Sequence, residues 1–455
     1  MNLNNINSVY CVGIGGIGMS ALARWFHFQK KEVAGYDRIK TTLTASLERE
    51  GIHVHYEDDT KLVPPNFKDP QTTLVVYTPA VPMTHNELSF FTEKGFFVKK
   101  RSEVLGIITR DVYSIAVAGT HGKTTISSMI AHLLNASEMG CSAFVGGIMT
   151  NYNTNVLLAG TDSPVIMEAD EYDRSFMRLS PDYSILNSLD PDHLDIYQDR
   201  DSMVSTYLDF LKLNDVKGRL LIHRDPAQQL GDKLDGFQYR SFGLKNADIT
   251  ANNLRVEDGN NLFDYEGITA IKDLKLKLPG FHNISNAVAA ITVALDMGMD
   301  SLLVKESLST YNGVKRRFEY VYRSDELIYI DDYAHHPTEI KALLNSVRFL
   351  YPDKKVTVVF QPHLYSRTRD FSEGFSESLS LADEVVMLPI YPAREEPIQG
   401  ITSQIIYDGI TVRKSLMEKS DFPDVLKKLK PEVLLTVGAG DIDQLVIPIK
   451  SLYAS

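Results

Sequence analysis

The sequence predicts an α/β protein of three domains, and three observations support that fold class. The chain has 455 residues, more than one ordinary hydrophobic core organises. Short apolar segments alternate with amphipathic segments, a pattern typical of parallel sheets covered by helices. This alternation starts again near residues 105 and 315. We therefore predict domains at 1–105, 106–314 and 315–455.

The first domain is predicted to be Rossmann-like. Its strands are predicted at 8–14, 32–37, 73–81 and 95–100, with a helix at 19–31. Gly13, Gly15 and Gly18 form a G-x-G-x-x-G pattern between the first strand and that helix. Asp37 follows at about the 20-residue distance of a ribose-binding acid. Taken alone, this pattern favours an NAD-dependent oxidoreductase.

The second domain opens with another phosphate-binding pattern, "AGTHGKTT", between an apolar strand and a helix. In such a loop the glycines let backbone amides face phosphate groups, Lys123 supplies a positive charge and Thr124 can bind Mg²⁺. The loop departs from the usual G-x-x-x-x-G-K-[ST] pattern because Val117 stands where the first glycine is expected. These features predict a P-loop ATPase-like central domain with a parallel sheet.

Acidic residues follow the next two predicted strands of this domain. Glu168, Asp170 and Glu171 come directly after one strand, and "DPDHLD", with His193, follows the other. Because parallel strands bring their carboxyl ends to one edge of a sheet, we expect these groups to converge near the loop. Glu168 and His193, together with Thr124, are therefore the candidate Mg²⁺ ligands.

The remaining chain adds an antiparallel patch and a third sheet. Residues from about 245 to 280 alternate polar and apolar side chains, which predicts antiparallel strands before a helix at 283–298. After residue 315 the strand–helix alternation returns, with apolar segments at 354–363, 382–391 and 432–441. This predicts a Rossmann-like C-terminal domain.

Composition narrows the expected partners and compartment. A net charge of −12 argues against non-specific nucleic-acid binding, and no apolar run is long enough to span a membrane. Cys11 and Cys141 are expected to be buried, reduced thiols. The segment "MNLNNINS" lacks the cationic start of a signal peptide, so a cytoplasmic location is expected.

An ordered set of motifs resembles the Mur ligase family. It comprises "GIGGIGMS", "AGTHGKTT", "EADEYD", "DHLDIY", "GFHNISNAVAA", "GVKRRFE", "DDYAHHPTE" and "QPHLYSRT", running from residue 13 to about 370. The resemblance implies an ATP- and Mg²⁺-dependent ligase of peptidoglycan precursor synthesis that forms an amide through an acyl phosphate. Within the family the motifs are most similar to the alanine-adding branch, which implies UDP-N-acetylmuramate and L-alanine as substrates. The resemblance leaves a monomer or a homodimer open.

The resemblance also implies a role for individual residues, in four groups. Lys123, Glu168, His193 and Arg317 would be catalytic. The ATP-binding residues would be Gly119, Thr120, His121, Gly122, Lys123, Thr124, Thr125, His282, Asn283, Asn286, Arg317 and Asp332. The UDP-sugar would contact Gly15, Gly16, Ile17, Gly18, Asp37, Thr78, Arg101, His121 and Asn155. The amino acid would contact Tyr333, His336, His363 and Arg367.

Several alternatives stay open. Asn283 could instead cap the following helix, and the family pattern alone favours His336 over His335. Leu364 stands where the alanine-adding branch often has arginine, which leaves the amino-acid specificity open. A recycling ligase that attaches a preformed tripeptide to UDP-N-acetylmuramate shares these motifs. An NAD-dependent oxidoreductase and a P-loop switch protein are the alternatives from other classes.

Overall fold

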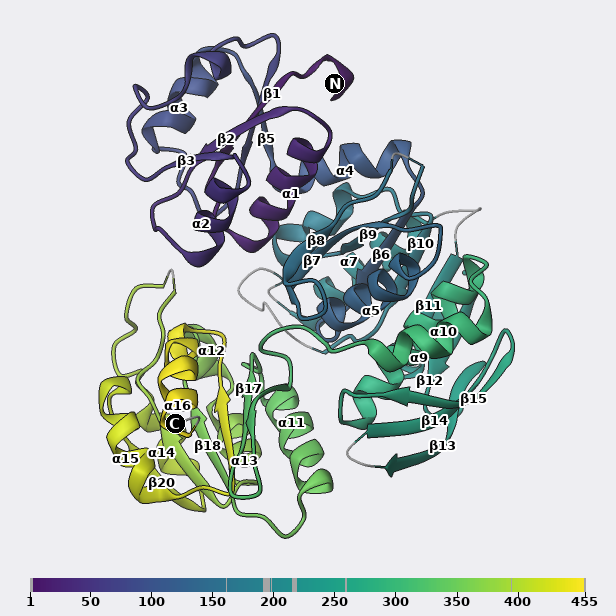
Figure 1. Cartoon of the computed structure of the whole chain (residues 1–455), viewed down its shortest axis with the longest axis vertical. Helices are drawn as coiled ribbons and strands as arrows, with labels where there is room; N and C mark the ends of the chain where they lie inside the picture. Colours follow the sequence, from purple (N-terminus) through teal and green to yellow (C-terminus); the bar gives the residue numbers. More distant parts are fainter. Residues whose placement is uncertain are drawn as a thin grey trace. The chain divides into compact units, whose positions relative to one another are not determined.

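The computed structural model describes residues 3–160, 162–190, 197, 199–214, 219–257, 260–393 and 395–453. The chain forms two compact units. The first comprises Met1–Asn252, Asp264–Leu274 and Ser285–Tyr311, and the second comprises Asn253–Phe263, Lys275–Ile284 and Asn312–Ser455. Three sheets of five, ten and six strands confirm the predicted α/β class (Figure 1).

The five-stranded sheet is parallel and has the order β3-β2-β1-β4-β5. Its strands are β1 (Ser8–Val12), β2 (Glu32–Tyr36), β3 (His53–His55), β4 (Thr73–Tyr77) and β5 (Phe97–Lys100). The associated helices are α1 (Ile17–Phe28), α2 (Thr42–Arg49), α3 (Asn86–Glu93) and α4 (Arg101–Asp111). The strand order reverses beside β1, so the first glycine loop lies at the switch point where such sheets bind ligands.

Both faces of this sheet are covered, so every residue of β1 is buried. Val9 and Cys11 pack with α1, α2 and α4, whereas Tyr10 and Val12 pack with Phe91 of α3 on the other face. Cys11 and Cys141 are unbonded and buried, as predicted, and burial raises the pKa of both thiols to about 12. Both sulfurs therefore stay protonated at neutral pH.

The ten-stranded sheet has the order β15-β14-β13-β12-β11-β10-β6-β9-β7-β8. Its strands are β6 (Ser114–Ala118), β7 (Ser142–Met149), β8 (Thr154–Leu157), β9 (Val165–Glu168), β10 (Tyr183–Leu186), β11 (Arg219–His223), β12 (Tyr239–Gly243), β13 (Ile249–Glu257), β14 (Asn260–Glu266) and β15 (Ala270–Leu276). Its helices are α5 (Lys123–Asn135), α7 (Arg200–Lys212), α8 (Arg224–Leu230), α9 (Phe281–Asp296) and α10 (Ser301–Thr310). Strand β6 pairs in parallel with β9 and β10, so their carboxyl ends share one edge with the second glycine loop.

The predicted patch at 245–280 consists of β13, β14 and β15, which are neighbours in the sheet. Connections of two and three residues between these neighbours are too short for parallel pairing, which needs a crossover of about a dozen residues. The patch is therefore antiparallel, as its alternating sequence predicts.

The six-stranded sheet lies in the second unit and has the order β16-β17-β21-β18-β19-β20. Its strands are β16 (Glu319–Arg323), β17 (Ile328–Asp332), β18 (Val356–Phe360), β19 (Glu384–Met387), β20 (Arg413–Leu416) and β21 (Val433–Val437). Its helices are α11 (Pro337–Leu350), α12 (Tyr365–Asp370), α13 (Ser372–Leu379), α14 (Gln404–Gly409), α15 (Phe422–Leu429) and α16 (Val446–Tyr453). Only β16 runs antiparallel to its neighbour, and an apolar cluster covers each face of the sheet.

Among the described residues, no helix is long and apolar enough to cross a membrane.

Candidate active site

The second glycine loop joins β6 to α5 and presents the start of that helix to the carboxyl edge of the sheet. Gly119 and Gly122 have φ angles of 131° and 82°, which side-chain-bearing residues rarely adopt. The first amides of a helix have no partner within it, and their dipoles favour an anion at this end. Thr124 and Thr125 are buried in this first turn. The residues predicted to bind phosphate therefore lie in one short loop and in the first turn of α5.

Lys123 begins α5, and its ammonium group is fully engaged. Its Nζ donates to the Gly119 carbonyl at 2.7 Å and to the two carboxylate oxygens of Glu171 at 2.8 and 2.7 Å. Burial acts to lower the pKa of Lys123, but Glu171, with Asp170 and Glu168 farther away, raises it above its ordinary value. Lys123 is therefore a fixed positive charge in this loop.

The segment after β10 holds the loop in shape. The backbone amide of His121 donates to Ser188 Oγ at 2.7 Å, and Asn187 Nδ2 donates to the His121 carbonyl at 3.0 Å. The Thr120 hydroxyl lies 3.0 Å from Ser188 Oγ and accepts from the Asp190 amide at 3.1 Å. Sequence reasoning missed these residues, although "ILNSLD" directly follows an apolar strand and so carried the signal.

Two of the three predicted metal ligands, Thr124 and Glu168, lie within the described residues. Glu168 ends β9 and accepts a hydrogen bond from the Gly146 amide of β7 at 2.5 Å. Thr124 lies in the first turn of α5, while His193 lies outside the described residues. Within the described part of the chain, no group of three histidine, cysteine, aspartate or glutamate side chains is arranged to hold a metal ion. Of the predicted ligands, Thr124 and Glu168 are therefore the two whose surroundings the structure describes.

Helix α9 carries the three residues predicted to contact adenine. Asn286 lies beside the phosphate loop, where its Oδ1 accepts from Asn187 Nδ2 at 3.3 Å. Asn283 lies inside α9, so it does not cap the helix, and its side chain donates to the Pro279 carbonyl at 2.7 Å. His282 is exposed to solvent. Asn286 is therefore linked to the phosphate loop through Asn187, which also donates to the His121 carbonyl.

The first glycine loop gathers three of the residues predicted for the UDP-sugar. A Cβ atom added at Gly13 would lie 2.7 Å from Thr78, and one at Gly18 would lie 3.0 Å from the Arg101 guanidinium. Asp37, directly after β2, accepts from the Gly15 amide at 2.7 Å. Thr78 and Arg101 thus border the loop. Asp37 supports the loop backbone through one carboxylate oxygen.

Asn155 has a different environment from the one that the resemblance implies. Its side chain is fully buried on β8, where it donates to the Ile17 carbonyl and to Ser20 Oγ at 2.5 and 3.1 Å. Its Oδ1 accepts from Arg24, which also forms a two-pronged ion pair with Glu50. In this structure Asn155 fastens the first turn of α1 to β8.

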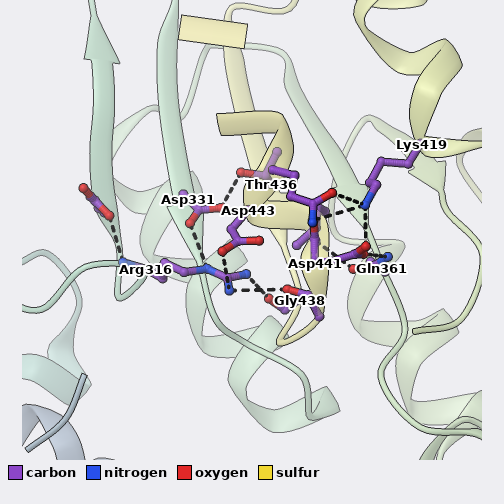
Figure 2. A network of polar contacts seen from close by, with 12 residues as sticks. Arg316, Asp331, Gln361, Lys419, Thr436, Gly438, Asp441 and Asp443 are labelled. Atoms are coloured by element: carbon purple, nitrogen blue, oxygen red, sulfur yellow. Dashed lines mark hydrogen bonds and ion pairs between the residues drawn. The ribbon is translucent and has the colours of Figure 1, made fainter. Parts of the chain in front are cut away.

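The second unit distinguishes the two adjacent arginines before β16. Figure 2 shows Arg316 within a polar network, with Nε 3.2 Å from Asp331 and Nη2 donating to the Gly438 carbonyl at 2.6 Å. Asp331 is buried and also accepts from Thr436 at 2.6 Å. Arg316 is therefore structural. The guanidinium groups of Arg316 and Arg317 both lie over the Tyr333 ring, 5.1 and 5.3 Å from its centre, and Arg317 also opposes electrostatically the rise that burial causes in the pKa of Asp332.

Aromatic and histidine side chains gather around Tyr333 at the carboxyl edge of this sheet. The His335 ring lies 5.3 Å from the Tyr333 ring and 6.0 Å from the His363 ring, and His363 stacks on Tyr391. Nearby, Asp332 accepts from the amides of Phe318 and Ala334. Burial raises the pKa of Asp332 to about 6, although Arg317 and these amides act in the opposite direction.

His335 and His336 both have partners within the protein: His335 Nδ1 lies 2.9 Å from the Tyr333 carbonyl and 3.4 Å from a Glu339 carboxylate oxygen. His336 is buried, its Nδ1 accepts from the Thr338 amide at 3.3 Å, and its ring packs against Phe371. It is therefore the N-cap of α11, immediately before the proline that begins the helix. Arg367 is buried in α12, two residues after Tyr365.

Comparison with known proteins identifies the family. The Mur ligase catalytic domain matches residues 8–113, the Mur ligase middle domain matches 117–294 and the Mur ligase glutamate ligase domain matches 316–442. A UDP-N-acetylmuramate–L-alanine ligase of Cytophaga hutchinsonii is 48% identical over 99% of this chain and 98% of its own. The same-named protein of Flavobacterium johnsoniae is 47% identical over 99% of both chains. The chain belongs to the Mur ligase family.

Solved Mur ligase structures share the architecture of the whole chain. The UDP-N-acetylmuramate–alanine ligase of Thermotoga maritima is 29% identical, with a TM-score of 0.81 over 98% of this chain and 99% of its own. A murein peptide ligase of Psychrobacter arcticus has a TM-score of 0.70 at 20% identity over 97% and 98%, a likeness of fold alone. The three sheets of this chain are therefore those of a Mur ligase.

Proposed function

We propose that this Mur ligase joins L-alanine to the carboxylate of UDP-N-acetylmuramate, with hydrolysis of ATP to ADP and phosphate, in the synthesis of peptidoglycan precursors. The single observation that carries this proposal is full-length identity of 45–48% to ligases named for that reaction. Two separate phosphate-binding turns support it, because a nucleotide sugar and ATP each need one. We also propose a cytoplasmic location.

The domain division proposed for this function follows the predicted boundaries. Residues 1–105 would bind the UDP-sugar, 106–314 would bind ATP and 315–455 would bind the amino acid. One sheet in each segment and three family matches at 8–113, 117–294 and 316–442 support the division.

ATP is proposed to place its phosphates over the start of α5. Lys123 would neutralise the phosphate oxygens, and the free amides of the first turn would donate to them. Thr124 and Glu168 would hold Mg²⁺; both offer oxygen atoms, the ligands that this ion prefers. The ion would lower the charge of the triphosphate. Asn286 and Asn283 remain the proposed adenine contacts, with His282, and Asp332 remains proposed for the ribose.

The reaction then needs two displacements, and the protein's contribution is mainly charge neutralisation and positioning. A carboxylate oxygen of UDP-N-acetylmuramate attacks the γ-phosphorus, and ADP leaves. The uncharged amine of alanine attacks the acyl carbon, inorganic phosphate leaves, and the amine nitrogen loses its proton to form the amide. Lys123 and Arg317 are the proposed cationic partners of the transferred phosphoryl group.

The two substrates other than ATP are proposed to use the remaining predicted residues. Gly15, Gly16, Ile17 and Gly18, at the start of α1, would receive the pyrophosphate of the UDP-sugar, with Thr78 and Arg101 beside them. In the second unit, Arg367 is the proposed partner of the alanine carboxylate, because a guanidinium matches both oxygens. Tyr333, His336 and His363 remain the other proposed amino-acid contacts, and the His335 ring lies between those of Tyr333 and His363.

A phosphate-release assay tests the proposal. With ATP, Mg²⁺ and UDP-N-acetylmuramate, release is expected only when L-alanine is added, together with a product whose mass equals the two substrates less one water. Lys123→Ala is expected to abolish release while UDP-N-acetylmuramate still binds, because that ligand uses another loop. Release that requires a preformed tripeptide instead of alanine would identify a recycling ligase and contradict the proposed substrate.

A further inference from the structure

The phosphate-loop lysine already has a full set of acceptors from the protein itself. An ammonium group has three N–H donors. Lys123 Nζ has three acceptors within 2.7–2.8 Å, which are the Gly119 carbonyl and the two oxygens of Glu171. A phosphate oxygen that bonds to Lys123 must therefore replace one of these three contacts, two of which are made by Glu171.

Glu171 is held firmly enough to compete for the lysine. Its side chain is buried, with only 2% of it exposed. Its backbone carbonyl accepts from the buried Tyr197 hydroxyl at 2.5 Å and from the Arg174 amide at 2.9 Å. The residue directly precedes the 3-10 helix η3 (Tyr172–Arg178), whose Phe176 stacks on Phe210 of α7. The carboxylate is thus part of a packed corner and not a mobile surface acid.

The local charge opposes a nucleotide that arrives without a cation. Asp170 and Glu168 also act electrostatically on Lys123, so one ammonium group faces three carboxylates. Adding a triphosphate alone would place several more negative charges beside Glu171 in a partly buried site, where repulsion is weakly screened. A nucleotide that carries Mg²⁺ brings two positive charges with it and reduces this repulsion.

From this geometry we propose that Glu171 is a competing counter-ion for Lys123 that makes the phosphate loop selective for the metal–nucleotide complex. Without nucleotide, Glu171 occupies the lysine. Metal-free nucleotide and inorganic phosphate displace it poorly, whereas the metal–nucleotide complex displaces it readily. Glu171 is thus a positioning residue, acting on substrate through Lys123. The inference rests on the proposed binding of ATP at this loop.

The test compares nucleotide affinity with and without Mg²⁺ in the full-length protein, by calorimetry with ADP and with a non-hydrolysable ATP analogue. Glu171→Gln keeps the size of the side chain but removes its charge. It is expected to tighten metal-free nucleotide binding by about tenfold, since a charge-assisted hydrogen bond contributes about 1.4 kcal/mol or more. The affinity for the Mg²⁺ complex is expected to change much less, so the ratio of the two dissociation constants falls.

Asp170→Asn is the matched control, because Asp170 acts on Lys123 electrostatically, whereas Glu171 also accepts hydrogen bonds from its ammonium group. Asp170→Asn is expected to change the logarithm of the ratio of the two dissociation constants by less than half as much as Glu171→Gln does. Glu171→Ala is measured in parallel, with circular dichroism, so that a folding defect of one variant does not decide the result. If both Glu171 variants fold and keep the wild-type ratio, the inference is wrong. If the wild-type protein binds no nucleotide even with Mg²⁺, the proposed function itself fails.

Discussion

One methyl group added at Gly122 should disrupt the phosphate loop more than the rest of the fold. Its φ of 82° is left-handed, and alanine there costs about 1 kcal/mol. The new Cβ would also lie 2.3 Å from Asn187 Nδ2, so Asn187 must move. That side chain donates to the His121 carbonyl and to Asn286, two hydrogen bonds of about 1 kcal/mol each. Gly122→Ala should therefore lower the free energy of unfolding of the first unit by about 3 kcal/mol and abolish measurable nucleotide binding.

Gly298→Ala is the matched control, because Gly298 has a φ of 89° and no atom within 4 Å of an added Cβ. It should lose only the backbone contribution of about 1 kcal/mol and bind nucleotide normally. Urea unfolding followed by the fluorescence of Trp25, the only tryptophan, reports on the first unit. Calorimetry with ADP and Mg²⁺ measures binding. Equal losses of stability in the two variants, or wild-type binding by Gly122→Ala, would show that Asn187 does not support the loop.

Two further predictions concern a strained backbone and a buried acid. Leu364 has φ and ψ of 70° and 138°, a region nearly confined to glycine. Leu364→Gly should therefore stabilise the second unit by about 1 kcal/mol in calorimetry, and it should raise the KM for alanine because the turn before Arg367 becomes looser. A destabilised variant would refute the strain at Leu364. Burial raises the pKa of Glu87 to about 7, with the Tyr10 hydroxyl at 2.7 Å opposing and Asp58 adding to the rise. The folded state therefore holds the Glu87 proton more tightly than the unfolded state does. The contribution of Glu87 to the free energy of unfolding is greatest below about pH 4.5 and falls by about 3 kcal/mol as the pH rises to 7. Glu87→Gln should remove that slope in Trp25-monitored unfolding, and an unchanged slope would contradict the assignment.

The sequence was most informative where a feature depends on one short segment. Lys123 and the glycines beside it lie between a strand and a helix, so their placement follows from local pattern alone. The N-cap role of His336 also follows from local sequence, because a helix-starting proline comes directly after it.

Features that depend on strand order were not predictable in the same way. Asn187 and Ser188 support the loop only because β10 pairs beside β6, a neighbour 65 or more residues away in sequence. Glu168 ends β9, and Asp170 and Glu171 follow it, but only the turn into η3 brings Glu171 into hydrogen-bond contact with Lys123. The resemblance already pointed to Arg317, but the structural role of Arg316 was not predictable, because it depends on Asp331 and Gly438, which lie far from Arg316 in sequence.

The most direct test of the proposed chemistry is to follow ¹⁸O from the substrate carboxylate. UDP-N-acetylmuramate labelled in both carboxylate oxygens is incubated with the protein, ATP, Mg²⁺ and L-alanine, and the released phosphate is examined by mass spectrometry. An acyl phosphate requires one ¹⁸O atom in each phosphate released, with the other retained in the amide. Unlabelled phosphate would show that ATP is hydrolysed without activating the carboxylate, and would contradict the account.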